Sequence, residues 1–411
     1  MQVLHSCCCG LDVHKRFVVA CLIRGGEDGK PQKELRRFDT LTPQLLSLID
    51  WLQSAQCTHV ALESTGVYWK PIFNLMEGLF EIVLVNAQHM KAVPGRKTDT
   101  KNAEWIADLL QHGLLKASFI PPQPQRDLRD LTRYRSSLKQ ERTQHVNRVH
   151  KLLEETNIKL SSIFADMMCK TGRAILQALA RGEENPEVLA DLALFWAPHK
   201  RDALVPALQE RMRAHHRFLL QELLAMIETL ERAIGRLDRE IEERLAEHKE
   251  TLERLDEITG VSQRVLETLF AEIGWELDTF PDAAHLASWV GICPGQKESG
   301  GKQMSGRTRK GNRYAKTILV QAAHAAGKTK HTYLGAQYRR LSKGRGIKRA
   351  AVAVGHSILV IYYHMLTTSQ PYQEKGEDYF VHHDQQEKQR RLVKQLERLG
   401  YTVKLTQEHA G

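Results

Sequence analysis

The chain has 411 residues, with 59 Lys and Arg against 49 Asp and Glu, which gives a formal net charge of +10 at pH 7. With 42% hydrophobic and 26% charged residues, the composition excludes a disordered, collagenous or disulfide-stapled protein, and the length indicates two or three domains. The basic balance favours polyanionic partners.

The N-terminal part alternates strand and helix signals. Two apolar, β-branched runs separated by a very short connection predict an antiparallel hairpin. The predicted order is three strands, helix, strand, helix, strand and helix, which resembles the ribonuclease-H-like (RuvC-like) fold, a mixed α/β sheet flanked by helices. The predicted strands cover residues 3–13, 17–23, 34–38, 59–62 and 82–85, and predicted helices begin with Thr42 as N-cap before Pro43 and at about Val67.

The cysteines indicate a reducing compartment. There are seven, an odd number, without a C-x-x-C motif. Cys7, Cys8 and Cys9 are adjacent, so they alternate between the faces of a strand and predict strand core rather than a metal site. The N-terminus lacks the features of a signal peptide, and we therefore expect a cytoplasmic protein.

Residues 121–250 have a helical pattern. Apolar residues spaced alternately by four and three form the seam of a coiled coil. This part is expected to space domains or to join subunits into a dimer or tetramer, and the same spacing fits an internal helical hairpin. The seam residues are Leu223, Ile227, Leu230, Ile234, Leu237 and Ile241.

Residues 251–370 predict a mostly helical C-terminal domain, followed by a polar tail over 371–411. Residues 258–262 interrupt two helices at Gly260 and resemble a helix-hairpin-helix, although any helix pair needs such a turn. The apolar run 350–363 is too short to span a membrane and predicts a buried helix, so no membrane partner is expected.

Positive charge is concentrated in residues 297–349, which hold 15 Lys and Arg and one acid, so this segment carries +14 and the rest of the chain −4. Such a block is typical of nucleic-acid binding. A second basic stretch, 126–151, fits nucleic-acid contact and a solvated helix face equally well. The candidate nucleic-acid-binding residues are Lys302, Arg307, Arg309, Lys310, Arg313, Arg339, Arg340, Lys343, Arg345, Lys348 and Arg349 in the first segment, and Arg133, Arg135, Arg142 and Arg148 in the second.

Oxygen-bearing side chains gather in the N-terminal domain. Asp12 ends the first predicted strand and Glu63 follows the fourth, and these strands are neighbours in the proposed fold. Asp99 and Asn102 are three residues apart and share a face of the following helix. Clustered carboxylates repel unless a cation compensates them, and Mg²⁺ prefers oxygen ligands. The set therefore predicts a metal site suited to phosphoryl transfer.

These motifs, Gly-Leu-Asp-Val-His-Lys, Leu-Glu-Ser-Thr-Gly and Gly-Arg-Lys-Thr-Asp-x-Lys-x-Ala-Glu-Trp, resemble the acidic motifs of the DEDD-type insertion-sequence transposases of the IS110 family. The resemblance covers nearly the whole chain and implies Asp12, Glu63 and Asp99 as Mg²⁺ ligands. The fourth family position is Asp, and here it is Asn102, which offers a carbonyl oxygen without charge. Of two Mg²⁺ ions, one is therefore expected to bind weakly.

A serine lies in the basic segment. Ser299 precedes two glycines in a predicted loop, and its motif, Pro-x-x-x-x-Ser-Gly-Gly-Lys, resembles the transposase-domain motif of the same family. The resemblance implies that Ser299, rather than nearby Ser305, attacks DNA and forms a phosphoserine link at a composite site, with the serine coming from another protomer. It also implies a structured noncoding guide RNA that pairs with target and donor DNA.

The sequence predicts an RNA-guided DNA recombinase, the transposase of an insertion sequence, with Asp12, Glu63, Asp99, Asn102 and Ser299 as catalytic residues. Two alternatives stay open. One is a metal-dependent junction or flap nuclease with water as nucleophile. The other is an impaired descendant that only binds RNA and DNA, because Asn102 replaces an Asp. The predicted domains are 1–120, 121–250 and 251–370, with the tail 371–411.

Overall fold

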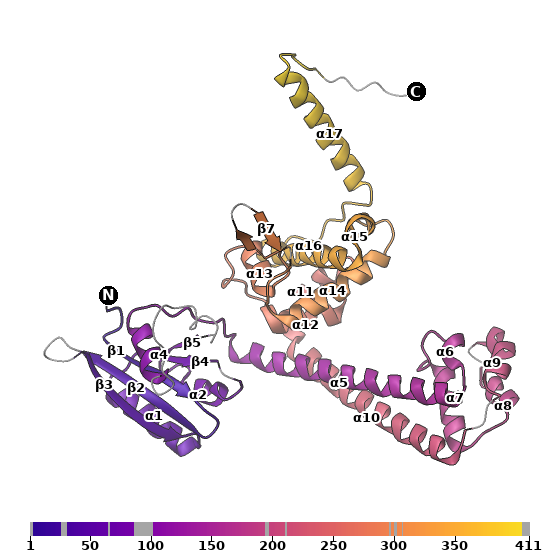
Figure 1. The fold of residues 1–411 in the computed structure, drawn as a ribbon, viewed down its shortest axis with the longest axis horizontal. Coiled ribbons are helices and arrows are strands. Elements are labelled where there is room, and N and C mark those ends of the chain that lie inside the picture. The colour runs from indigo at the N-terminus through magenta and orange to yellow at the C-terminus, as the bar shows by residue number, and fades with distance from the viewer. Residues whose placement is uncertain are drawn as a thin grey trace. The chain divides into compact units, whose positions relative to one another are not determined.

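The computed structural model describes residues 3–25, 31–64, 66–85, 102–193, 197–209, 212–295, 297–299, 302–305 and 307–404. Contacts within the chain define two units, Met1–Pro121 and Pro122–Gly411. Figure 1 labels their helices and strands.

The N-terminal unit is built on a mixed five-stranded sheet with the strand order β3-β2-β1-β4-β5. The central strand β1 pairs antiparallel with β2 and parallel with β4. The predicted α/β order and the predicted pairing of the first and fourth strands are confirmed. The elements are β1 (Cys7–Val13), β2 (Phe17–Gly25), β3 (Pro31–Asp39), α1 (Thr42–Ser54), β4 (His59–Glu63), α2 (Trp69–Met76), β5 (Glu81–Val85) and α4 (Asn102–Gln111).

Helices cover both faces of this sheet (Figure 1). Cys9 and Leu11 of β1 belong to the apolar core under α1 and α2, whereas Cys8 belongs to the core under α4. The cysteine triplet is strand core, as predicted. Burial raises the pKa of the Cys8 thiol to about 12, so it stays neutral and cannot serve as a thiolate.

Two local predictions in this unit are wrong. The first strand begins at Cys7 rather than at Val3, because the backbone N–H groups of Leu4 and His5 donate to the carbonyl of Gln111 at 2.8 and 3.2 Å instead of entering the sheet. Thr42 is not the N-cap of α1. Leu41 occupies that position, no side chain caps the helix, and only the proline in the first turn is as predicted.

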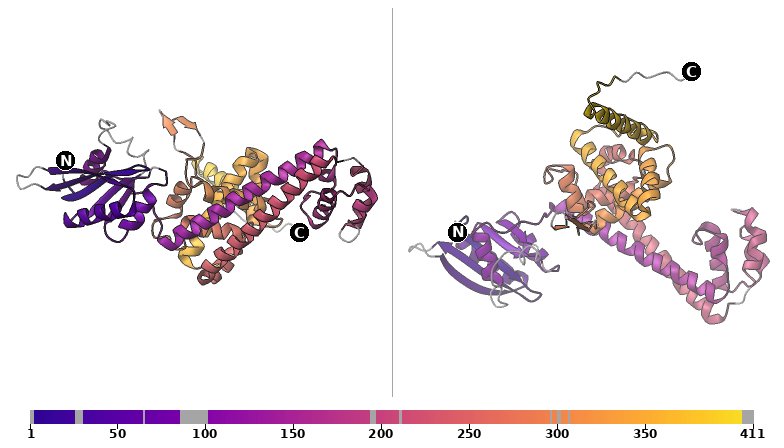
Figure 2. Two further views of the ribbon diagram at one scale, coloured as in Figure 1. Left: turned by 90° about the horizontal axis from the view of Figure 1, so that it is seen from below. Right: turned by 45° about the horizontal axis from the view of Figure 1, so that its top comes forward.

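A long helical hairpin begins the second unit. Helices α5 (Gln123–Glu155) and α10 (Ala214–Arg244) lie side by side, as both views of Figure 2 show. The buried seam residues Ile227, Ile234 and Ile241 recur every seven residues on α10. The seam therefore packs within an internal helical hairpin, one of the two arrangements that fit the sequence. Its role in joining subunits stays a prediction. Short helices cover one end of the hairpin: α6 (Leu160–Ile163), α7 (Lys170–Arg181), α8 (Pro186–Asp191), the 3₁₀ turn Pro198–Lys200 and α9 (Arg201–Ala207).

The C-terminal core is helical and surrounds α16 (Ile347–Thr368), whose Val354, Ile358 and Tyr362 are buried. By length and composition α16 could cross a membrane, and it is longer than the apolar run from which we predicted it, but its buried face packs inside this core. The predicted buried helix is therefore confirmed. The other elements are the 3₁₀ turn Ala246–His248, α11 (Lys249–Asp256), α12 (Gln263–Ile273), α13 (Ala283–Val290), β6 (Lys297–Ser299), β7 (Lys302–Ser305), α14 (Arg313–Lys328) and α15 (Tyr333–Arg345).

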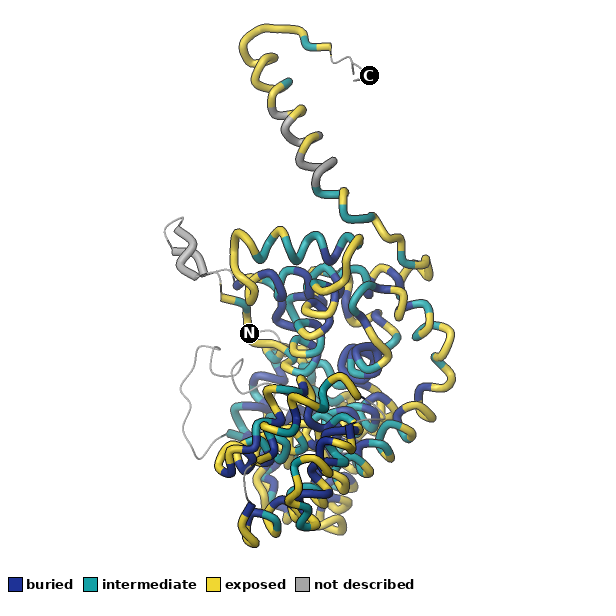
Figure 3. The backbone as a smooth tube through the Cα atoms, turned by 90° about the vertical axis from the view of Figure 1, so that its right-hand side faces the viewer, coloured by how far each residue is buried: buried dark blue, intermediate teal, exposed yellow. Residues whose placement is uncertain are grey.

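The turn between α11 and α12 is held by packing. Gly260 has a φ of +83°, and a Cβ there would lie 2.5 Å from the carbonyl oxygen of Ala322 on α14. The close approach of the turn to α14 is therefore enough to explain why residue 260 is glycine, without a bound ligand at the turn. Beyond the core, α17 (Tyr379–Arg398) carries the predicted polar tail, and of its residues whose burial is described most are exposed and none is buried (Figure 3).

Candidate active site and nucleic-acid interface

Asp12 and Glu63 occupy neighbouring positions in the sheet. The last parallel pair that joins β1 to β4 is Leu11 with Leu62, so each acid follows one residue later on its own strand. Neighbouring strands lie about 4.8 Å apart, which brings the two backbone positions close together.

Both acids face the helix α4. Side chains two residues apart on a strand share a face, so Asp12 lies on the side of Gly10 and Glu63 on the side of Ala61. A Cβ on Gly10 would lie 2.4 Å from the carbonyl oxygen of Ala103, and Ala61 shares a core with Ala103. The start of α4 therefore lies against the part of the sheet where both acids project.

The direction of α4 brings Asn102 to the same place. Cys8 contacts the carbonyl of Ala107 and Gly10 contacts Ala103, so α4 runs antiparallel to β1. Asn102 is the first residue of α4 and lies nearest to the Asp12 end of the strand. Its Oδ1 is buried, and no hydrogen-bond partner for it exists among the described residues.

An unpaired buried oxygen is costly, so this atom calls for a donor or a cation. Asp99 lies outside the described residues. Within the described ranges no three His, Cys, Asp or Glu side chains gather in a metal-binding group. Asp12 and Glu63, with the amide oxygen of Asn102, nevertheless form a set of hard oxygen donors, and this set fits a divalent cation.

His14 lies beside Asp12. From the sequence alone it was named only as part of the motif Gly-Leu-Asp-Val-His-Lys. Its Nε2 lies 3.3 Å from Oδ2 of Asp12, and the imidazole is 45% exposed against 16% for the carboxylate. Its position two residues after Asp12 was the available signal, because residues at i and i+2 of an extended segment lie on one side. His14 can orient Asp12 or carry a proton at this edge of the sheet.

Replacing Gly10 by Ala should disturb this arrangement. The added methyl would lie 2.4 Å from backbone atoms of both Ala103 and Ala107, which cannot swing aside as a side chain can. We expect a loss of about 1–3 kcal/mol in the free energy of unfolding, typical of overpacking, together with a displaced α4. Denaturant unfolding of Gly10→Ala measures it. Gly25→Ala on the same sheet is the control, because a Cβ there meets nothing within 4 Å. Equal stability of the two variants would contradict the close approach.

Ser299 lies in a two-stranded hairpin. It is the last residue of β6 and pairs with Lys302, the first residue of β7. The predicted loop is therefore wrong for Ser299 itself, because backbone pairing extends through it to the residue before the two glycines. At the base of the hairpin, the N–H of Gly295 donates to the carbonyl of Arg307 at 2.9 Å. The side chains of residues 296–306 lie outside the described part of the structure.

The chain that leaves this hairpin is anchored to the helical core. Gly291, with a φ of +75°, touches the other segment so closely that a Cβ would lie 2.8 Å from the nitrogen of Gly311. Asn312 then caps α14 through Oδ1 and donates from Nδ2 to Glu272 at 2.6 Å. Glu272 is fully buried and also accepts two hydrogen bonds of 2.7 Å from Arg133 of α5. The base of the hairpin is thus tied to both α12 and α5.

Comparison with known proteins identifies both regions. A family model for DEDD transposases of IS110, described as "Transposase", matches residues 9–158, and one described as "Transposase IS116/IS110/IS902 family" matches residues 252–339. The first range holds Asp12, Glu63 and Asn102, and the second holds Ser299. A Pseudomonas aeruginosa protein named "Probable family 20 transposase" is 27% identical over 270 residues, which cover 65% of this chain and 70% of that relative.

This chain belongs to the IS110 family of transposases. Transposases cleave and transfer DNA strands, so the predicted enzyme class and the predicted DNA substrate are confirmed at that level.

Three basic residues of the long helix α5 form ion pairs with acidic residues of the same chain. Arg133 is paired with Glu272, and Arg142 is paired with Glu231 at 2.8 Å. Arg135 contacts Glu267 and, at 3.3 Å, Asp238, and its side chain is only 4% exposed. The side chain of Arg135 is buried against Glu267, so our prediction that it contacts nucleic acid is corrected. Arg133 and Arg142 also have acidic partners but are 36% and 30% exposed, so for these two residues nucleic-acid contact stays a prediction. Arg148 remains exposed and keeps that prediction.

Arg135→Gln should destabilise the transposase strongly. It removes a cation from Glu267, which is 1% exposed, and an unpaired buried charge is costly. We expect a loss of about 3 kcal/mol, the lower end for a broken buried pair, because Arg264 remains 3.1 Å from Glu267. Denaturant unfolding measures it, with exposed Arg148→Gln on the same helix as control. A loss below that of the control would return Arg135 to the nucleic-acid candidates.

The basic residues of the C-terminal domain are mostly on its surface. Arg339 is half-buried and donates to the carbonyl of Thr329 at 2.9 Å, and Arg340 lies 4.5 Å from the centre of the Phe380 ring. The side chain of Lys302 lies outside the described residues. The candidates with exposed side chains are Arg307, Arg309, Lys310, Arg313, Arg340, Lys343, Arg345, Lys348 and Arg349.

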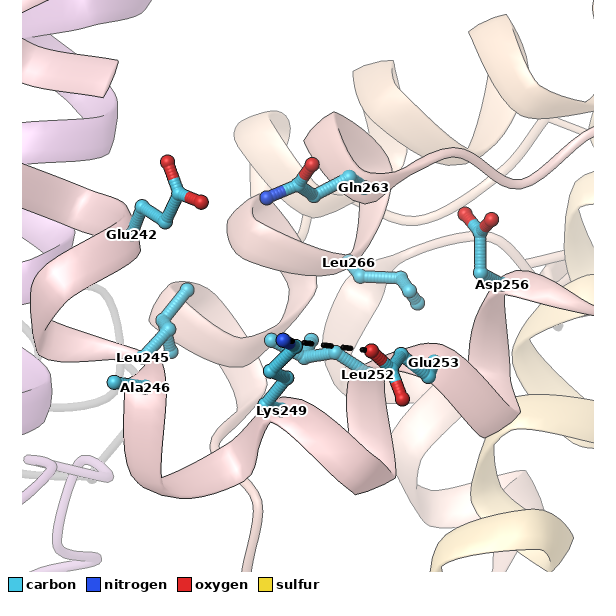
Figure 4. A pocket seen from close by; sticks show the side chains of 9 residues that line it. All are labelled: Glu242, Leu245, Ala246, Lys249, Leu252, Glu253, Asp256, Gln263 and Leu266. Carbon is cyan, nitrogen blue, oxygen red and sulfur yellow. Dashed lines mark ion pairs between the residues drawn. The ribbon is translucent and has the colours of Figure 1, made fainter. Parts of the chain in front are cut away.

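A pocket at the end of α10 does not belong to this basic surface. Figure 4 shows Glu242, Glu253 and Asp256 around it, with Lys249 lying 3.9 Å from Glu253. Its volume is about 340 Å³. Because acids outnumber the single lysine, the pocket repels phosphates, and we assign it no part in binding nucleic acid.

Proposed function

We propose that this protein is the transposase of an insertion sequence that cuts and rejoins DNA through a covalent link to Ser299, directed by a structured noncoding RNA. The observation that carries the metal-dependent half of this proposal is the pairing of β1 with β4, which puts Asp12 and Glu63 at adjacent positions under the start of α4. The strand order and the helices on both faces support a ribonuclease-H-like (RuvC-like) domain.

The proposed metal ligands are Asp12, Glu63, Asp99 and Asn102. The buried Oδ1 of Asn102, which has no partner among the described residues, supports this assignment. Bound Mg²⁺ would stabilise negative charge on the phosphate and the leaving oxygen. Since Asn102 brings no charge, the second of two ions is expected to bind weakly. Asp12, oriented by His14, holds its carboxylate at the edge of the sheet where substrate can approach.

Ser299 is the proposed nucleophile. Its Oγ forms a bond to phosphorus as the bond from phosphorus to a deoxyribose oxygen breaks, and the hydroxyl proton leaves to a base while the released oxygen is protonated. The phosphoserine keeps the phosphoester, so rejoining needs no other energy source. The close approach of Gly291 to Gly311 and the contacts of Asn312 fix the base of the hairpin, which supports a serine presented from the helical core. The proposed assembly is a dimer or tetramer in which the serine comes from another protomer.

The exposed cations of the C-terminal domain are proposed to hold phosphate backbone of DNA and guide RNA. They carry charge without a base-reading motif, which fits a protein whose sequence choice is made by base pairing.

The test is a denaturing gel with peptide mass analysis. Purified protein is incubated with Mg²⁺, RNA transcribed from the flanks of its gene, and labelled DNA that spans the junction of the element. A DNA adduct on Ser299 that forms only with both Mg²⁺ and RNA supports the proposal. Cleaved DNA without an adduct supports instead a metal-dependent nuclease that uses water.

Asn102 favours the second alternative, an impaired descendant, and this has its own test. Asn102→Asp adds a charged ligand beside Asp12 and Glu63, so we expect the Mg²⁺ concentration for half-maximal cleavage to fall about 10-fold or more. Cleavage measured across Mg²⁺ concentrations gives this value. Wild-type activity that is equal to or higher than that of the variant would remove the support for an impaired enzyme.

A further inference from the structure

A groove of about 990 Å³ lies in the C-terminal domain between the base of the β6–β7 hairpin and helices α15 and α16. One part of its lining is cationic and another part is apolar, and none of its described lining residues is acidic. The cationic residues are Arg307, Arg345, Lys348 and Arg349, and the apolar ones include Ile292, Leu341 and Val352.

Three of these cations are not used inside the protein. Arg345 ends α15, and Lys348 and Arg349 lie in the first turn of α16, which contains no acid. All three are exposed, and no ion pair involves them within the described part of the chain. In this they differ from Arg133, Arg135 and Arg142 of α5, each of which is paired with an acid. Like charges gathered this closely repel one another until a polyanion neutralises them.

The apolar part of the groove narrows the choice of polyanion. A duplex presents phosphates and sugars and keeps its base faces stacked inside, so an apolar surface between cations gains nothing from it. An unpaired strand exposes its bases, which can pack on such a surface while its phosphates meet cations. His356 also lines the groove. Burial lowers the pKa of His356, so at pH 7 it offers a neutral flat ring rather than another charge.

We infer that this groove binds an unpaired segment of a nucleic-acid strand, with its phosphates on Arg345, Lys348 and Arg349 and its bases over the partly exposed Leu341 and Val352. The inference rests on the proposed function and deepens it. Pro294 and Thr308, which pair at the base of the hairpin, both line the groove. A strand held there passes beside the hairpin that carries Ser299, where strand exchange requires unpaired DNA.

Fluorescence anisotropy tests this with full-length Ser299→Ala protein, which binds without reacting. The probes are labelled oligodeoxythymidylate, oligouridylate, an abasic strand and a duplex of the same length, between about 50 and 200 mM salt. The variant Lys348→Gln/Arg349→Gln is compared with Lys328→Gln/Lys330→Gln, which removes two exposed cations of the same basic segment outside the groove.

For the single strands, the groove variant should flatten the slope of log affinity against log salt by about 1.4, at about 0.7 for each lost phosphate contact. The control variant and the duplex should change less. Leu341→Gln, checked for an unchanged melting temperature, should weaken binding of thymidylate but not of the abasic strand. Preference for the deoxy or the ribo strand tells whether DNA or guide RNA is the occupant.

Equal effects of the two double variants, or equal losses for duplex and single strand, would overturn the inference. The adduct assay with unmutated protein reads out separately. A Ser299 adduct without groove-dependent binding would support the proposed function and overturn the inference about the groove. Groove-dependent binding without an adduct would support the inference and contradict the proposed covalent link to Ser299.

Discussion

Ser299→Ala should abolish the covalent protein–DNA adduct while leaving the protein folded and able to bind DNA. Removing the Oγ atom removes the only group that can form the proposed bond to phosphorus, so the loss is complete rather than partial. The substitution is conservative for the fold, because β6 pairs with β7 through backbone groups. The measurement is the amount of labelled DNA that stays with protein on a denaturing gel.

Ser305→Ala is the matched control. Ser305 ends β7 and pairs with Lys297, so it lies at the base of the same hairpin in which Ser299 lies at the tip. We expect the control to keep its adduct. An adduct that persists in Ser299→Ala and disappears in Ser305→Ala would assign the nucleophile to Ser305. If Ser299→Ala instead cleaves DNA at the wild-type rate, water is the nucleophile and the protein is a nuclease.

Asp12→Asn should lower the rate of DNA cleavage by more than about 100-fold at fixed Mg²⁺, because a direct ligand matters at least as much as groups that only orient one. The change removes one of the two carboxylates that β1 and β4 bring together. Stability should be unchanged or higher without Mg²⁺, since the repulsion between Asp12 and Glu63 is relieved. Cleavage rates across Mg²⁺ concentrations and melting temperatures with and without Mg²⁺ measure both effects.

Asp39→Asn provides the comparison, because Asp39 is an exposed acid at the end of β3, the edge strand of the same sheet. It should leave both cleavage and Mg²⁺ dependence unchanged. A fall in activity of similar size in both variants would mean that general charge near the sheet matters, and the assignment of Asp12 as a ligand would fail. A large loss of stability in Asp12→Asn without Mg²⁺ would make Asp12 a structural residue.

The strands and helices of the N-terminal domain could be predicted because their signals are local. Alternation in β1 placed Cys8 and Cys9 on opposite faces, and the structure puts them in separate cores. The neighbouring position of Asp12 and Glu63 followed from the order of elements, because a sheet of this order places the first strand beside the fourth. The predicted start of the first strand was wrong because the N–H groups of Leu4 and His5 donate to the carbonyl of Gln111, which no local pattern encodes.

The basic residues show the opposite case. Arg135 and Arg148 have the same charge on the same helix, yet one is buried against Glu267 and the other is exposed. The available signal was the presence of Glu267 and Glu272 among the apolar residues of the stretch 265–273 in α12, since a buried acid requires a partner. That signal indicates that a cation is needed and leaves open which one.

By itself the sequence determined the element order, the site of the acidic residues, the serine motif and the concentration of positive charge, because each depends on residue type and spacing along one chain. Only the tertiary structure decided which cations pair with buried acids, that the seam of α10 packs against α5, and that Arg345, Lys348 and Arg349 line one groove with an apolar surface. These features depend on which segments pack together. The free-energy cost of burying a charged side chain is fixed only once the segments around it have packed.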